Sequence, residues 1–111
     1  MTTPELDFYC HEALSGHTRV EKLLESNDVL AFRHTKPKWQ THIVVVPKRH
    51  VTSLVDATFT EEQLSTLMRA VRQIAAEVLA ATGECRVVTN LGRYQDSMHL
   101  HWHVTAGERR T

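Results

Sequence analysis

The chain has 111 residues, of which 41% are hydrophobic and 23% charged, with 13 Lys and Arg balancing 13 Asp and Glu. This length and composition are typical of one folded domain and exclude a disordered or fibrous chain. Without a net positive charge, nothing would concentrate nucleic acid or an anionic membrane at the surface. We therefore expect a single domain over residues 1–111 that binds neither nucleic acid nor a membrane.

Apolar segments and cysteines indicate the cellular compartment. No apolar run approaches the roughly 20 residues of a membrane span, and the first residues lack the pattern of a secretory signal. Only Cys10 and Cys85 are present, which is too few for a disulfide framework. We therefore expect a cytoplasmic protein.

Taken in chain order, the predicted elements begin with a hairpin around the turn formers Ser26, Asn27 and Asp28. A β-branched run closed by Pro47 predicts a strand that is buried on both faces. The five expected strands cover residues 20–25, 29–32, 42–46, 86–90 and 98–105.

A long helix is predicted between the third and fourth strands. Thr60 and Gln63 form a capping-box pattern at its start, and Gly83 is a stop signal at its end. Apolar residues recur between them at helical spacing, so one face should pack on the core. Five strands and one long helix predict an α+β fold with an antiparallel sheet.

Three of the 8 histidines, His99, His101 and His103, occupy alternate positions near the C-terminus. Alternate residues of a strand share a face and lie about 6.6 Å apart at Cα, so three imidazoles can face one phosphate-sized anion. A neutral imidazole can attack phosphorus and form a covalent intermediate. We expect this face to point to the surface, so that His101 contributes little to packing.

Two other interpretations of the three histidines stay open. His-x-His on a strand can also bind zinc, which would make the three residues the ligands of a zinc-dependent hydrolase. The face could also be an ordinary polar surface.

The segment His99-Leu100-His101-Trp102-His103-Val104-Thr105 resembles the His-φ-His-φ-His-φ-φ signature of the histidine-triad (HIT) superfamily. The similarity continues through residues 28–32, 41–50 and 90–92, and to Gln95, four residues before the triad. The pattern is most similar to the Hint branch of nucleoside phosphoramidases and nucleotidyl hydrolases. The resemblance implies a HIT-like five-stranded antiparallel sheet with one long helix, extended across a homodimer.

The resemblance also implies roles. His101 would be the nucleophile that takes the nucleoside monophosphate from a purine nucleotide or nucleotide conjugate, with no cofactor needed for catalysis. His99 would orient His101, while His103 and Asn90 would bind the α-phosphate. His42 would lie beside the leaving group. Gln95 would hold the phosphate or the attacking water.

Two departures from the family pattern affect the substrate site. Asp96 occupies the place of a phosphate-facing Ser, so either Ser97 substitutes for it or the leaving-group preference has changed. At the sugar site, Phe32 is followed two residues later by His34, where the family has an Asp that accepts hydrogen bonds from both ribose hydroxyls. Because imidazole cannot copy this contact, we expect weak ribonucleotide binding and poor discrimination against deoxyribose.

A third departure concerns structural zinc, which family members often bind through Cys-x-x-Cys and two histidines. The matching residues here are Asp7, Cys10, His50 and His99. Carboxylate is an acceptable zinc ligand, so a zinc-bound and a metal-free site both fit.

The same covalent intermediate would serve a dinucleoside polyphosphate hydrolase or a nucleotidyltransferase, which analysis of the products would distinguish. A third alternative is a regulatory module that binds nucleotides without turnover.

Overall fold

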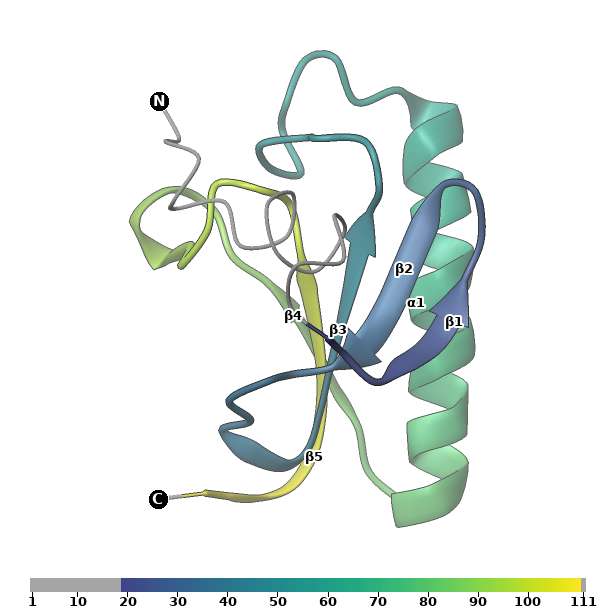
Figure 1. The fold of residues 1–111 in the computed structure, drawn as a ribbon, viewed down its shortest axis with the longest axis vertical. Helices are drawn as coiled ribbons and strands as arrows, with labels where there is room; N and C mark the ends of the chain where they lie inside the picture. Colours follow the sequence, from purple (N-terminus) through teal and green to yellow (C-terminus); the bar gives the residue numbers. More distant parts are fainter. Residues whose placement is uncertain (1–18, 111) are drawn as a thin grey trace.

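The computed structural model describes residues 19–110, which form a five-stranded sheet with one long helix on one face (Figure 1). The elements are β1 (Lys22–Glu25), β2 (Val29–Arg33), β3 (Trp39–Pro47), α1 (Glu61–Thr82), β4 (Arg86–Thr89), a short 3-10 helix (Gly92–Tyr94) and β5 (Trp102–Arg109). The strand order is β1-β2-β3-β5-β4, and all four neighbouring pairs are antiparallel. The predicted α+β class and antiparallel sheet are confirmed.

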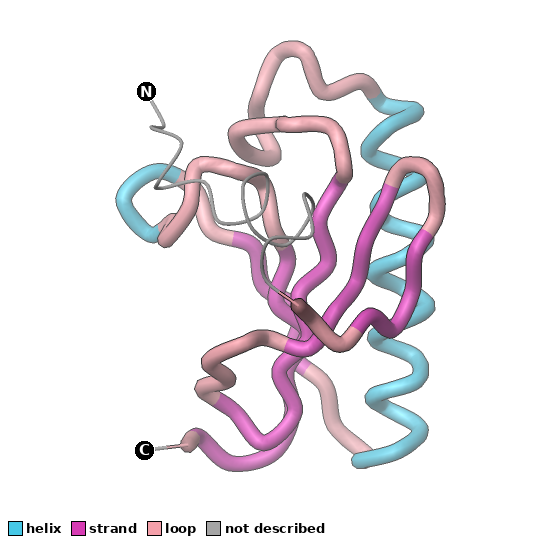
Figure 2. The backbone as a smooth tube through the Cα atoms, in the orientation of Figure 1, coloured by secondary structure: helices cyan, strands magenta, loops and turns pink. Residues whose placement is uncertain are grey.

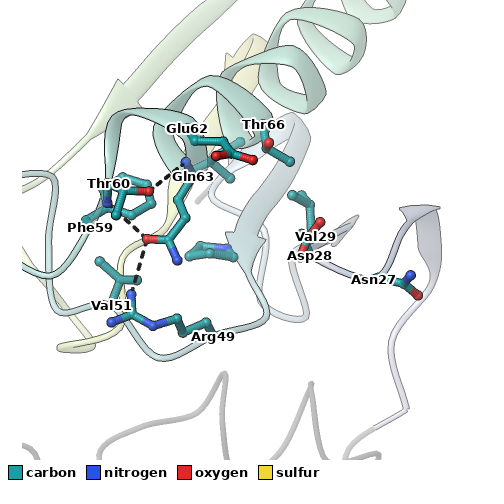
Figure 3. Close-up of a pocket in the computed structure, with 12 residues that line it drawn as sticks. Asn27, Asp28, Val29, Arg49, Val51, Phe59, Thr60, Glu62, Gln63 and Thr66 are labelled. Atoms are coloured by element: carbon teal, nitrogen blue, oxygen red, sulfur yellow. Dashed lines mark hydrogen bonds between the residues drawn. The ribbon is translucent and has the colours of Figure 1, made fainter.

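The helix α1 begins and ends where the sequence predicts. The Thr60 hydroxyl accepts a hydrogen bond from the Gln63 backbone N–H at 3.1 Å, and the Gln63 side-chain oxygen accepts one from the Thr60 N–H at 3.0 Å (Figure 3). Gly83 ends the helix in the left-handed conformation, with a φ of 82°, which glycine adopts without a steric penalty. Among residues 19–110 no helix is both long and apolar enough to cross a membrane.

The two faces of the sheet bury different amounts of apolar surface. The face toward α1 carries the main core, in which helix residues such as Leu67 and Ile74 pack against Ile43, Val45 and Val104. The opposite face holds a smaller cluster, whose buried members are Leu30, Phe32, Val44 and Val46. The histidines of β3 and β5 lie on this second face, because they alternate with the core residues of their strands.

Three strands begin at positions that the sequence pattern did not predict. β1 begins at Lys22 rather than Val20, β3 begins at Trp39 rather than His42, and β5 begins at Trp102 rather than Met98. The register would place Leu100 opposite Pro47, which has no N–H to donate. The Leu100 carbonyl therefore has no donor at this position, the Pro47 carbonyl accepts from the His99 side chain, and the Leu100 N–H donates to the Val51 carbonyl at 2.6 Å. Figure 2 shows the result, in which the loops after β3 and before β5 lie at the same end of the sheet.

Candidate functional site

Four imidazoles follow one another across the face of the sheet opposite α1. The ring centroids of His101 and His103 are 5.0 Å apart, those of His103 and His42 are 5.0 Å apart, and those of His42 and His34 are 4.4 Å apart. Strand pairing sets this order, because β5 carries His103 beside β3, and His34 follows β2 directly. The structure therefore brings together four of the predicted site residues.

The tautomer of His101 is fixed by the main chain. The Nδ1 atom of His101 lies 2.7 Å from the carbonyl oxygen of His99. Because a carbonyl can only accept, Nδ1 carries the proton, and the neutral ring keeps its lone pair on Nε2. His101 exposes only 2% of its surface, so the expectation of a surface-facing histidine with little role in packing is wrong. His101 precedes β5, in a segment where Ser97, His99 and Leu100 are buried as well.

His42 and His103 share a hydrogen bond of 2.9 Å between Nε2 and Nδ1, respectively. The backbone N–H of Lys38 donates to Nδ1 of His42 at 3.0 Å, so neutral His42 must carry its proton on Nε2 and donate it to His103. The proton of neutral His103 then lies on its own Nε2. This chain of donors gives both rings one definite tautomer.

The protein keeps these two imidazoles neutral. Removal from water, together with the nearby His34 and Lys38, lowers the pKa of His42 to about 4. Removal from water also lowers the pKa of His103 to about 4, helped by the neighbouring histidines and opposed by Asp96. At neutral pH both rings are therefore uncharged hydrogen-bonding groups.

His34 is half-buried beside this pair. The backbone N–H of Lys36 donates to Nδ1 of His34 at 2.9 Å, so neutral His34 carries its proton on Nε2 and cannot accept a further hydrogen bond on the ring. Burial lowers the pKa of His34 below its usual range, and the charge of Lys38 acts in the same direction. The sequence analysis predicted this residue at the site but not its contact with His42.

His99 is turned away from the other two triad rings. It is fully buried, and its Nε2 donates to the Pro47 carbonyl at 2.8 Å. Its ring lies against His50, with centroids 5.1 Å apart and nearly perpendicular planes. Any orienting effect on His101 therefore comes from the His99 carbonyl and not from its imidazole.

The structure describes only half of the predicted zinc site. His50 and His99 lie side by side, and the Nε2 atom of His99 is occupied by its bond to the Pro47 carbonyl. Asp7 and Cys10 lie outside the described residues. Within residues 19–110 no group of three or more His, Cys, Asp or Glu side chains is arranged to hold a metal ion. A zinc centre formed by the three triad histidines therefore does not match the arrangement.

The polar residues that precede the triad have distinct positions. Asn90 directly follows β4, and extension of the β4–β5 register places it opposite His101. Ser97 is buried, and its hydroxyl has no hydrogen-bond partner among residues 19–110. Gln95 donates through Nε2 to the carbonyls of Thr52 at 2.8 Å and Ser97 at 3.1 Å. This side-chain amide therefore holds the loop in place.

A cavity of about 270 Å³ opens beside the imidazoles. Its lining comprises His34, Lys38, Trp39, His42, Arg86, Val88, Asp96, His103 and Thr105. Asp96 thus faces the site. Phe32 does not line the cavity, because it is 1% exposed within the smaller apolar cluster. It supports the site from beneath, and its predicted contact with substrate stays a prediction.

Lys38, Trp39 and Arg86 also line the cavity, although no sequence motif singled them out. The position of Arg86 could have been predicted by pairing the fourth predicted strand with the fifth. This pairing places Arg86 opposite Thr105, on the face that carries His103. No comparable signal existed for Trp39, which reaches this face through an irregularity in the β3–β5 register between Trp39 and Thr41.

A second cavity, of about 360 Å³, lies near the start of α1 and is lined by residues such as Asp28, Arg49, Thr60 and Glu62 (Figure 3). None of its lining residues is a predicted site residue, so we do not assign the activity to it.

The fold is a small α+β domain with a five-stranded antiparallel sheet. Its candidate site is a row of neighbouring imidazoles beside a cavity on one face of that sheet. The chain belongs to the HIT family, since the HIT domain model matches residues 16–110. It is 38% identical over 100 residues to an uncharacterized 13.2 kDa HIT-like protein from Azospirillum brasilense, covering 86% of this chain and 82% of that protein.

Solved structures agree with this assignment. A histidine triad protein from Clostridium difficile is 30% identical with a TM-score of 0.75, covering 95% of this chain and 93% of that chain. A HIT family hydrolase from Legionella pneumophila is 24% identical with a TM-score of 0.78, covering 95% of this chain and 96% of that chain, and shows the shared fold.

Proposed function

We propose that the protein is a nucleotide-binding hydrolase or transferase that acts at the α-phosphate through a covalent intermediate on His101. The observation that carries the proposal is the 2.7 Å contact between His101 Nδ1 and the His99 carbonyl. It leaves the Nε2 lone pair free of the proton, as a nucleophile requires. A phosphoramidate or a nucleotidyl conjugate is the expected substrate.

In the first step, Nε2 of His101 attacks the α-phosphorus, and the bond from phosphorus to the leaving nitrogen or oxygen breaks. The leaving group takes up a proton and departs. The phosphorylated imidazole is cationic, and the His99 carbonyl stabilises it by accepting the Nδ1 proton in a hydrogen bond. Water then attacks the phosphorus and releases a proton to solvent, which balances the proton taken up by the leaving group. The nitrogen–phosphorus bond breaks, and the nucleoside monophosphate leaves.

Other residues would stabilise the phosphate during both steps. The donor chain from Lys38 through His42 leaves the Nε2 proton of His103 available for a phosphoryl oxygen. The unpartnered Ser97 hydroxyl is a second candidate donor, consistent with its replacing the Ser that the family has at position 96. Asn90, opposite His101 in the extended register, is a third.

The direct test is hydrolysis of adenosine 5′-phosphoramidate by wild type and by His101→Ala. We expect a loss of at least ~1000-fold in kcat/KM, which corresponds to roughly 4 kcal/mol of barrier. Because His101 is buried, the unfolding midpoint of the variant must be measured as well. A variant that folds and keeps a rate near wild type would contradict the covalent mechanism.

Chemical rescue separates loss of the nucleophile from damage to the fold. In His101→Gly, added imidazole should restore part of the turnover, whereas a damaged fold would not respond. Detection of a nucleotidyl group on His101 by mass spectrometry after rapid quenching would identify the intermediate. Binding of nucleotide with no turnover would instead favour the regulatory module, and product analysis on dinucleoside polyphosphates would test the hydrolase alternative.

We also propose that two copies join along β4. This strand lies at the edge of the sheet, and Val87 on it is 40% exposed, while Leu79 on α1 is 54% exposed. An open strand edge beside exposed apolar side chains favours pairing with a second sheet. Sedimentation at several protein concentrations would measure the oligomeric state, and a monomer throughout would contradict this proposal.

A further inference from the structure

The cavity beside His103 has an arrangement of charge that the proposed chemistry at His101 does not use. Along β5 the face runs from His101 to His103 and then to Thr105, which pairs with Arg86 on β4. Two residues of a strand span about 6.6 Å. The cavity therefore extends from His103 of the triad toward Arg86.

The far part of the cavity is rich in cations and hydrogen-bond donors. Lys38 and Arg86 both line it, and neither takes part in an ion pair with any of residues 19–110. Because these groups only donate, they suit a ligand group that only accepts.

Asp96 is the one acidic side chain in the lining of this cavity. It lies in the loop before the triad and acts on the pKa of His34 and of His103. Lys38 instead acts on His42 and His34. Lys38 and Asp96 both act on His34, in opposite directions, whereas Arg86 lies two strand positions beyond His103, opposite Thr105.

The wall between the triad and these cations is apolar. The guanidinium carbon of Arg86 lies 4.9 Å from the centre of the Trp39 ring, which holds the cation over the indole. Val88 lies opposite His103 and continues this wall. An alkyl chain can lie against Trp39 and Val88, and its end then meets Arg86 and Lys38.

We propose that this cavity binds the leaving group of the substrate and selects leaving groups that end in a carboxylate or a phosphate on a short alkyl chain. The proposal rests on the function proposed above, and it makes Arg86 and Lys38 residues that determine specificity. They act on the part of the substrate that departs and do not contact the reacting phosphorus.

The test uses matched adenosine phosphoramidates that differ only in the charge of the amine. The leaving amines are 4-aminobutyrate, its uncharged amide, and 3-aminopropylphosphonate. We expect wild type to prefer the two anionic leaving groups by about 3- to 10-fold in kcat/KM, which is the range for partly exposed charge contacts. The carboxylate and the phosphonate compared with each other show which anion fits better.

Variants then assign the preference to residues. Arg86→Met keeps an unbranched side chain over Trp39 but removes the charge, so it should abolish most of the preference by lowering turnover of the two anionic substrates more than turnover of the amide. Lys38→Met should reduce the preference in the same way. The control is Arg72→Met, since Arg72 is exposed on α1, on the other side of the sheet, and this change should affect none of the three substrates.

Equal turnover of charged and uncharged leaving groups by wild type would overturn the proposal. So would an equal loss on all three substrates in Arg86→Met, because the cavity would then bind the nucleoside. If no phosphoramidate is turned over, the proposed function fails. Calorimetric titration of the three conjugates then tests the cavity separately, and equal affinities would reject it.

Discussion

The hydrogen-bonded pair of His42 and His103 predicts a loss of stability in weak acid. In the folded protein the pKa of His42 is about 4, against an ordinary value of 6.5. Since one pKa unit corresponds to 1.36 kcal/mol, this difference amounts to about 3 kcal/mol for His42, which is 6% exposed. His103 adds less, because it is only partly buried and its protonation is coupled to that of its partner.

The direction follows from the lowered pKa. Between pH 6.5 and 4 the unfolded chain binds protons that the folded protein does not, so unfolding becomes easier as the pH falls. The contribution is complete above pH 6.5 and is lost as the pH falls toward 4. A loss of about 3 kcal/mol is large compared with the usual 5–15 kcal/mol of total stability.

The assay is urea unfolding of wild type and His42→Gln between pH 8 and pH 4. We expect the free energy of unfolding of wild type to fall by about 3 kcal/mol or more from pH 7.5 to pH 4.5. His42→Gln keeps an N–H donor but does not titrate. Its free energy of unfolding should therefore fall less steeply with pH than that of wild type, because unfolding of the variant takes up about one proton fewer. An unfolding free energy that is the same at both pH values would refute the reasoning, as would NMR titration of His42 near pH 6.5.

Two further predictions concern the sugar and the metal. His34→Asp should strengthen binding of adenosine monophosphate by roughly 10-fold or more and increase the preference for ribose over deoxyribose, because a carboxylate can accept from both hydroxyls. A strong ribose preference in wild type that the substitution leaves unaltered would contradict it. If Asp7, Cys10, His50 and His99 bind zinc, elemental analysis should find up to one metal per chain, and chelation should lower Tm. Metal-free protein that melts at the same temperature with and without chelator would show that the site is vestigial.

The parts of the fold that depend on local signals could be predicted from the sequence. The capping box at Thr60 and the stop at Gly83 fix the helix within one stretch of chain. The turn at residues 26–28 likewise joins two strands that pair with each other. Both signals act between residues a few positions apart, so no distant contact was needed to interpret them.

The start of β5 and the burial of His101 depend on distant contacts and could not be predicted in this way. The alternating pattern from Met98 onward is regular, but Pro47 on the partner strand cannot continue the ladder, and Val51 takes its place. The triad was therefore assigned to one strand face, whereas His99 and His101 precede the strand. The cavity was missed for the same reason, because Lys38 and Arg86 meet only after three strands have paired.

The carbonyl that fixes the His101 tautomer belongs to the main chain, and this affects which substitutions the site can tolerate. Every amino acid supplies such a carbonyl, so the hydrogen bond from Nδ1 does not depend on which side chain follows Met98. The His99 imidazole is thereby released for a separate task, which is to tie the segment before β5 to the Pro47 carbonyl at the end of β3. One residue thus contributes to reactivity through its backbone and to architecture through its side chain. Selection can change the second contribution without disturbing the first.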